Sequence, residues 1–129
     1  MRCLILKYIF VFLIGFIGYP AIEILWRGHT HITMAFAGGI CFLIIYLISL
    51  NLTQITIIEK ALIGALAITL VELVFGYIFN IVLKLNVWDY SAMPLNFHGQ
   101  ICLDYFLLWT GLCLLLFPFC NILDKYIFI

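Results

Sequence analysis

The chain has 129 residues, of which 67% are hydrophobic and 9% are charged, and its formal net charge is zero. Soluble domains have about 45–50% apolar and about 25% charged residues, so this composition excludes the usual soluble classes and indicates a membrane protein. The basic residues are scattered singly, which excludes a nucleic-acid-binding surface. The five cysteines have no zinc-ligand spacing, and we interpret them as mostly buried apolar residues.

Four apolar stretches are long enough to cross a bilayer as helices, which takes about 20 residues. They run from Leu4 to Trp26, from Met34 to Leu50, from Ile57 to Leu85 and from Gln100 to Leu123. The first stretch is longer than the apolar part of a signal peptide, and no cleavage pattern follows it, so we expect it to be retained. We predict an all-α membrane protein with a single four-helix domain over residues 1–129, surrounded by the lipid bilayer.

The distribution of cations predicts the orientation of the spans. Four spans place both ends of the chain on one side of the membrane. The cations on that side would be Arg2, Lys7, Lys60 and Lys125, and those on the other side Arg27 and Lys84. By the positive-inside rule, this distribution predicts cytoplasmic termini. The loops that carry the histidines would then face outward.

Short patterns recur in the two halves of the chain and suggest an internal repeat. The matching segments are Leu13–Gly15 with Leu62–Gly64, Glu23 with Glu72, and Gly38–Cys41 with Gly99–Cys102. We therefore predict two similar helical hairpins of the same orientation, related by an axis along the membrane normal. In this arrangement Glu23 and Glu72 occupy equivalent places and face the interior of the bundle.

The connection from Asn86 to Gln100 is the longest stretch that is neither uniformly apolar nor simply charged. Pro94 disfavours a helix, and the surrounding Asn and Gly residues tolerate turns. We expect a structured loop between the third and fourth spans, in which Trp88 packs against the bundle. The residues expected to cap the ends of neighbouring helices are Asp89, Ser91 and Asn96.

Ionisable residues within apolar spans are candidates for function, because inserting each one costs roughly 2.5–3.5 kcal/mol. Glu23 and Arg27 lie on one helix face, and a structural ion pair would explain them as well as a site would. Glu72 has no cation at helical spacing in its own span, so it is either protonated or paired across helices. The predicted polar cluster consists of Glu23, Arg27, His29, His31, Glu72, Asn80, Trp88, Asp89, Ser91, Asn96, His98 and Asp104.

Within this cluster, Asn80 is expected to form hydrogen bonds between helices, a role that is structural. The inner halves of the spans carry little charge, so we expect the inner end to be sealed. Arg27 is the one cation placed to offset several carboxylates at the outer end, and it should be the most sensitive single residue.

Other chemistries find less support in the sequence. The three histidines have no fourth ligand fixed by spacing, so we predict no metal and no other cofactor. Ser91, His98 and Asp89 are hydrolase residue types, but no nucleophile elbow accompanies them. The sequence has no glycine-rich phosphate loop, so any use of ATP would require a separate protein chain.

Several segments together resemble a known family over nearly the whole chain. They are Glu23–His31, Gly38–Cys41, Glu72 with Gly76, Trp88–Ser91, Pro94, Asn96 and Gly99–Cys102. The combination is similar to the small bacterial membrane proteins catalogued as ABC transporter permeases of the ABC-transporter type IV family. The resemblance implies a multi-pass protein of the bacterial plasma membrane with a role in transport.

Three classes of function remain open. The first is a permease-like transport component with an outward-facing polar site, working as a homo-oligomer or with a separate ATPase or other membrane partner. The second is an accessory or scaffold subunit of a membrane complex, in which the same residues fix the fold. The third is a small intramembrane enzyme that acts on lipid head groups with Asp89, His29 or His31 as the base.

Overall fold

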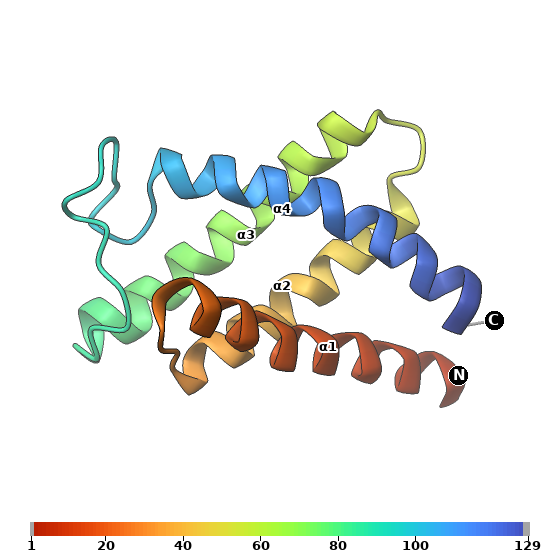
Figure 1. The fold of residues 1–129 in the computed structure, drawn as a ribbon, viewed down its shortest axis with the longest axis horizontal. Helices are drawn as coiled ribbons and strands as arrows, with labels where there is room; N and C mark the ends of the chain where they lie inside the picture. Colours follow the sequence, from red (N-terminus) through yellow and green to blue (C-terminus); the bar gives the residue numbers. More distant parts are fainter. Residues whose placement is uncertain (1, 128–129) are drawn as a thin grey trace.

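A computed structural model describes residues 2–127, with side chains from residue 4 onward. Its helices are α1 (Arg2–Arg27), α2 (Ile32–Asn51), α3 (Ile57–Phe75) and α4 (Leu103–Ile122) (Figure 1). Two of them continue as π-helical segments: α3 as η1 (Gly76–Val82) and α4 as η2 (Leu123–Ile127). All four helices are long and apolar enough to cross a membrane, which confirms the predicted all-α, four-span protein.

The boundaries of the third and fourth spans differ from the prediction. The third span ends at Val82 and the fourth begins at Leu103, so Gln100 belongs to the connection. Hydropathy alone cannot place these ends, because the connection is itself rich in apolar residues. Large apolar side chains remain exposed along the spans, such as Leu25 at 89% and Leu115 at 71%, and they are suited to contact lipid.

Local hydrogen bonds fix where several helices begin and end. The ring of His31 accepts a hydrogen bond from the backbone N–H of Thr33 and so caps α2. At the start of α3, the Thr56 hydroxyl accepts from the Glu59 N–H, which caps the helix, and donates to the Glu59 carboxylate. Gly28 follows α1 with φ of 82°, a conformation that costs glycine little.

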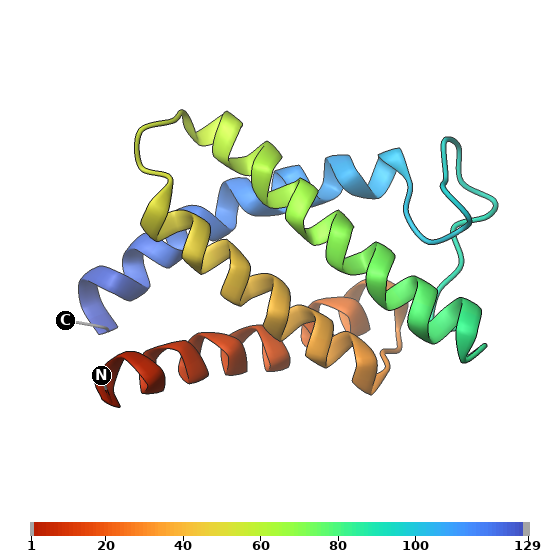
Figure 2. The same ribbon diagram turned by 180° about the vertical axis from the view of Figure 1, so that it is seen from behind.

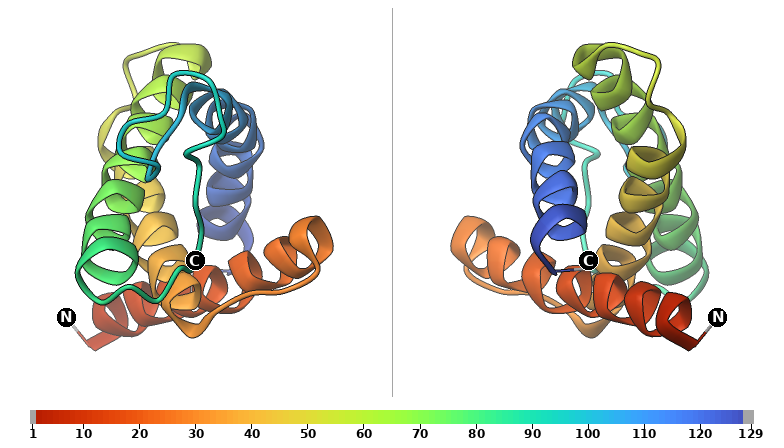
Figure 3. Two further views of the ribbon diagram at one scale, coloured as in Figure 1. Left: turned by 90° about the vertical axis from the view of Figure 1, so that its left-hand side faces the viewer. Right: turned by 90° about the vertical axis from the view of Figure 1, so that its right-hand side faces the viewer.

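The helices form two antiparallel hairpins of the same orientation, as predicted. Figures 1 and 2 show α1 and α3 running toward one end of the molecule, and α2 and α4 running back. We call the end with both termini and connection 52–56 the terminal end, and the end with connections 28–31 and 83–102 the loop end. Seen from the loop end, connection 83–102 crosses between α3 and α4 (Figure 3, left).

A glycine on the first helix of each hairpin allows close packing. A Cβ at Gly15 would run into Gly38 of α2 and a phenylalanine one turn further on. A Cβ at Gly64 would run into Cys113 of α4 and, again, a phenylalanine one turn further on. Cys113 is therefore the counterpart of Gly38, and the predicted match with Gly99–Cys102 is wrong, because that segment lies in the connection before α4.

The core has two parts. The larger part fills the middle of the bundle and includes Ile45, Phe117 and the buried Cys113 and Cys120, which supports the interpretation of these cysteines as apolar packing residues. A smaller cluster at the loop end contains Met34, Val87 and Trp88. Trp88 is 6% exposed, so the connection packs against the bundle as expected.

Charged and polar side chains tie the helices together at the terminal end. The Lys7 ammonium lies 3.3 Å from the Asp124 carboxylate and so joins α1 to η2. The Tyr46 hydroxyl donates a hydrogen bond to the same carboxylate from α2. Nearby, the Lys60 ammonium donates to the backbone carbonyl of Ser49 at 3.4 Å. At this end, the Asp124 carboxylate is therefore paired with the Lys7 ammonium and accepts a hydrogen bond from the neutral Tyr46 hydroxyl.

Candidate functional site

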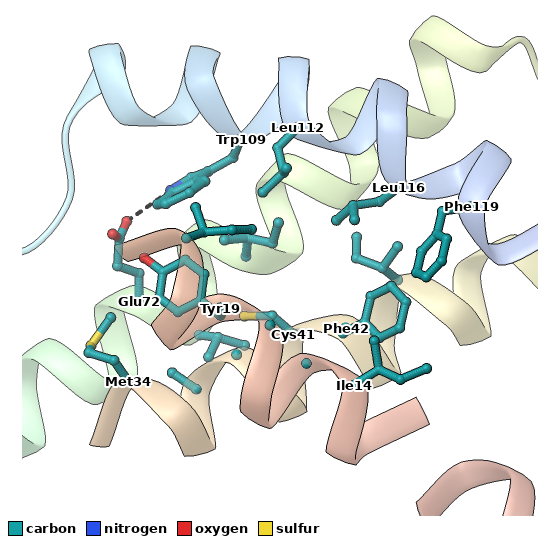
Figure 4. Close-up of a pocket in the computed structure, with 18 of the residues that line it drawn as sticks. Ile14, Tyr19, Met34, Cys41, Phe42, Glu72, Trp109, Leu112, Leu116 and Phe119 are labelled. Atoms are coloured by element: carbon teal, nitrogen blue, oxygen red, sulfur yellow. Dashed lines mark hydrogen bonds between the residues drawn. The ribbon is translucent and has the colours of Figure 1, made fainter. Parts of the chain in front are cut away.

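Glu72 is the buried carboxylate at the centre of the candidate site. It lies on α3, is 7% exposed and accepts two hydrogen bonds from residues distant in the sequence. The Tyr90 hydroxyl donates to Oε2 at 2.7 Å. The Trp109 Nε1–H donates to Oε1 at 3.3 Å, and Figure 4 shows this second hydrogen bond. Among the described residues, no Lys or Arg forms an ion pair with Glu72. Its two partners are therefore both neutral donors.

Tyr90 is suited to this donor role. Burial, and next the negative charge of Glu72, raise the pKa of Tyr90 well above its ordinary value. The phenol therefore stays protonated at neutral pH and donates a hydrogen bond to the carboxylate.

Glu23 has a different environment, although it is equally buried at 6% exposed. Arg27 Nη2 lies 3.3 Å from its Oε2, and the Thr30 hydroxyl donates to its Oε1 at 2.6 Å. The ion pair expected from the spacing of Glu23 and Arg27 is thus present. Arg27 also donates from Nη1 to the backbone carbonyl of Val87, whereas its buried Nε has no acceptor among the described residues.

Aromatic rings line the space between these two carboxylates. Tyr90 stacks on Tyr105 with ring centroids 4.6 Å apart, and Tyr105 lies 5.8 Å from Trp109. Tyr19 of α1 approaches Trp109 of α4 at 6.1 Å. Trp26 donates to the Tyr105 hydroxyl at 3.4 Å, which gives a second side-chain link between α1 and α4.

Two adjoining cavities follow these rings into the bundle. The outer cavity, of about 180 Å³, is lined by Glu23 and Arg27 together with aromatic side chains. The inner cavity, of about 200 Å³, is lined mainly by apolar residues of all four helices, and Glu72 is the charged residue among them (Figure 4). Tyr19 and Trp109 contribute to both linings, so the two cavities meet beside them.

The inner cavity lies between α1 and α4. In the described part of the chain, α1 packs on α2 and has no comparable packing on α3 or α4. Its side chains reach the α4–η2 helix near the loop end, through Tyr19 and Trp26, and at the terminal end, through Lys7. Between these links Gly18 lines the cavity, and a Cβ there would meet nothing within 4 Å. A slot therefore separates the middles of the two helices.

Connection 83–102 is anchored to η1 by two amides. Asn80 accepts from the backbone N–H of Val87 at 2.7 Å and donates to Gln100 Oε1 at 2.9 Å. The expectation that Asn80 joins helices is therefore wrong, because its partners lie in the connection. The Gln100 backbone carbonyl accepts from Trp88 Nε1 at 3.0 Å. A Cβ at Gly76 would meet the Gln100 side chain, so this glycine makes room for the anchor.

The expectation that polar residues of the connection cap helix ends is also wrong. Asp89 accepts from the backbone N–H of Ser91 at 2.9 Å, and this hydrogen bond lowers the pKa of Asp89 below its ordinary value. Asn96 donates to the backbone carbonyl of Met93 at 2.9 Å and accepts from the Gly99 N–H at 3.0 Å. These short side chains satisfy backbone groups two to five residues away within the connection, as Asx residues commonly do in turns.

The remaining predicted residues do not join Glu72. His29, His31 and His98 are exposed. Asp104 is also exposed; it lies in the first turn of α4, where the helix dipole favours a carboxylate, and so at the loop end of the fourth span. Within residues 4–127, no three His, Cys, Asp or Glu side chains are grouped so that they could hold a metal ion.

Sequence reasoning did not assign Tyr90, Trp109, Thr30 or Gln100 to the site. In the sequence, Tyr90 stands out only as part of the segment Trp88–Ser91, and Gln100 only as the start of an apolar stretch. One usable signal was the spacing of Tyr105 and Trp109, which places two amphipathic rings on one face of α4.

The comparisons with known proteins gave one match. A family model described as "Putative ABC-transporter type IV" matches residues 8–128. No curated protein and no solved structure matched the chain.

Proposed function

We propose that this chain, which belongs to the ABC-transporter type IV family, is a permease-like transport component with an outward-facing solute site. Family membership and the four apolar helices support a transport-related membrane protein. The proposed site is the pair of adjoining cavities beside Glu23, Arg27 and Glu72. The observation that carries the proposal is the continuity of these cavities, from a polar mouth at the loop end to an apolar slot inside the bundle.

Polar groups in the outer cavity could receive a solute. The guanidinium of Arg27 retains one donor without an acceptor, and a buried donor of this kind favours a ligand or water that can accept its hydrogen bond. The rings of Trp26 and Tyr105 flank the same cavity. At the terminal end, by contrast, Lys7, Tyr46 and Asp124 hold the helices together.

The charge distribution supports termini in the cytoplasm of a bacterial cell. Lys7, Lys60 and Lys125 lie toward the terminal end, whereas Arg27 and Lys84 lie toward the loop end. Under the positive-inside rule, the loop end and the mouth of the outer cavity then face outward. Because four helices enclose only a narrow path, transport would require a homo-oligomer or a separate ATPase partner.

A scaffold subunit is the second candidate, and the Glu23–Arg27 ion pair favours it. A pair that neutralises itself needs no ligand, and the polar groups of connection 83–102 largely satisfy one another. In a scaffold the cavities would be packing defects that water does not reach.

Access of water to the cavities distinguishes the two candidates. Leu112 lines both cavities, whereas Leu115 of the same helix is 71% exposed on the lipid side. In a variant with all native cysteines replaced by alanine, we expect Leu112→Cys to react with a membrane-impermeant charged thiol reagent added from the loop side. Leu115→Cys should stay unreacted, because thiolates form in water rather than in lipid.

The assay would use sealed vesicles of both orientations, with mass spectrometry to count the labelled thiols. If Leu112→Cys reacts no faster than Leu115→Cys, the transport site is wrong and a scaffold is favoured. Reaction only from the terminal side would contradict the outward-facing orientation.

A further inference from the structure

We propose that the inner cavity binds a lipophilic organic cation, which enters from the bilayer between α1 and α4 and places its positive charge beside Glu72. The inference rests on the proposed function, because it names the class of solute that the site takes. Three features of the cavity carry it: its charge, its aromatic walls and its opening.

The charge of the cavity selects the sign of the ligand. Glu72 is buried in a membrane-spanning helix, and its carboxylate has hydrogen bonds from Tyr90 and Trp109 but no ion pair among the described residues. A carboxylate can accept about four hydrogen bonds, so lone pairs remain available. A cation beside it would offset the cost of burying the negative charge.

Arg27 does not supply that compensating charge. It pairs with Glu23, and it lines the outer cavity rather than the inner one. The group formed by Glu23, Arg27 and Glu72 therefore carries an excess of one negative charge when both carboxylates are ionised. This excess favours a monovalent cation and disfavours an anion.

The cavity walls select a lipophilic ligand. Tyr19, Trp88 and Trp109 line the inner cavity, and nearly all of its other lining residues are apolar. Aromatic faces attract quaternary and alkylated ammonium groups through their quadrupoles. A sugar or another polyhydroxylated solute would lose hydrogen bonds to water that these walls cannot replace.

The slot between α1 and α4 gives such a ligand a route from lipid. The two helices are linked near their ends, and between the links Gly18 leaves the cavity wall without a side chain. A lipophilic cation concentrates in the bilayer, so a lateral opening suits it better than an opening to water alone.

Benzyltrimethylammonium is a suitable probe, because neopentylbenzene has the same shape with a neutral carbon in place of the nitrogen. We would measure binding of the labelled cation to the purified full-length protein in detergent by equilibrium dialysis. We expect saturable binding of the cation, with the neutral isostere competing at least about tenfold more weakly. Equal competition by the isostere would mean that the cavity recognises apolar shape alone, and would overturn the proposal.

A charge-removing substitution tests the role of Glu72. Glu72→Gln should weaken binding of the cation roughly 30-fold, because it removes one partner of a buried charge pair. Glu59→Gln is the matched control, since Glu59 is exposed at the opposite end of α3, and it should leave the affinity unchanged. Unchanged affinity in a folded Glu72→Gln variant would overturn the proposal.

A cavity-filling substitution keeps the proposal testable if Glu72→Gln does not fold. Gly18→Leu should abolish detectable binding, because the new side chain would occupy the slot. Gly111→Leu should bind normally, since Gly111 also has open space around its Cβ position but lines neither cavity. Equal binding by both leucine variants would place the ligand elsewhere and overturn the proposal.

The two proposals can fail separately. If Leu112→Cys reacts from the loop side but the wild-type protein does not bind the cation, the choice of solute class is wrong and the transport site stands. If the cation binds in a Glu72-dependent way while Leu112→Cys is unreactive, the lipophilic site stands and the opening to water is wrong.

Discussion

The two hairpins place a glutamate at matching positions but surround it differently. In the first hairpin, Glu23 is followed one helical turn later by Arg27, which pairs with it. In the second hairpin, the residue one turn after Glu72 is Gly76, and the space beside it holds Gln100 from the connection. Glu23 is therefore neutralised within its own helix, whereas Glu72 depends on neutral donors from distant segments. The first hairpin therefore neutralises its buried carboxylate with its own arginine, whereas the second leaves its buried carboxylate without an ion pair among the described residues.

The ends of the bundle repeat this contrast. At the terminal end, Lys7 faces Asp124 directly, so a cation and an anion link α1 to η2. At the loop end, the links between α1 and α4 are aromatic, through Tyr19 with Trp109 and Trp26 with Tyr105. Separating the rings would leave no charge unpaired, whereas separating Lys7 from Asp124 would leave two.

Removal of Arg27 should destabilise the first hairpin and cause the largest loss of stability among these variants. Arg27→Ala would leave the buried Glu23 with the Thr30 hydroxyl as its one remaining side-chain partner among the described residues. We expect a loss of about 3 kcal/mol or more in the free energy of unfolding, or failure to accumulate in the membrane. Thermal unfolding in detergent and the yield of folded protein measure this loss.

Lys125→Ala is the control for Arg27→Ala, because Lys125 is exposed and its nearest described partner is the ring of Tyr126. The Lys125→Ala variant should be as stable as the wild type. If Lys125→Ala proved the more damaging substitution, the emphasis on the loop end would be wrong.

Addition of one methyl group should disturb the second hairpin by an intermediate amount. Gly76→Ala would push the new Cβ into the Gln100 side chain and strain the anchor of connection 83–102. We expect about 1–3 kcal/mol of destabilisation, with faster hydrogen exchange at Val87 and Trp88. Gly111→Ala has open space and should cause no loss of stability. Slow exchange in Gly76→Ala, equal to that of the wild type, would show that the anchor does not hold the connection.

Removal of one charge at the terminal end should have the smallest effect. Asp124→Asn keeps an acceptor for the Tyr46 hydroxyl but loses the ion pair with Lys7. Because both side chains are partly exposed, we expect a loss of about 1 kcal/mol in the free energy of unfolding. High salt should lower the free energy of unfolding of the wild type toward that of Asp124→Asn. The difference in the free energy of unfolding between the wild type and Arg27→Ala should persist at high salt. A loss as large as that of Arg27→Ala would remove the contrast between the two ends.

The parts of the fold that follow from local patterns could be predicted from the sequence. The four spans and the shared orientation of the hairpins follow from hydropathy and connection lengths, and the pairing of Glu23 with Arg27 follows from helical spacing. The start of the fourth span was placed too early, at Gln100, because hydropathy does not show that α4 begins only at Leu103. The environment of Glu72 could not be predicted, because Tyr90 and Trp109 reach it only through tertiary packing.

The close contact of Gly15 with Gly38 bears on how the protein is assembled during synthesis. Helices α1 and α2 leave the ribosome first, and their interface requires no residue beyond α2. The pair can therefore associate in the membrane while α3 and α4 are still being translated, as in stepwise assembly of inserted helices. The slot between α1 and α4 joins the first and the last of these segments. It is consequently completed only when α4 has been inserted, and a truncated chain would lack it.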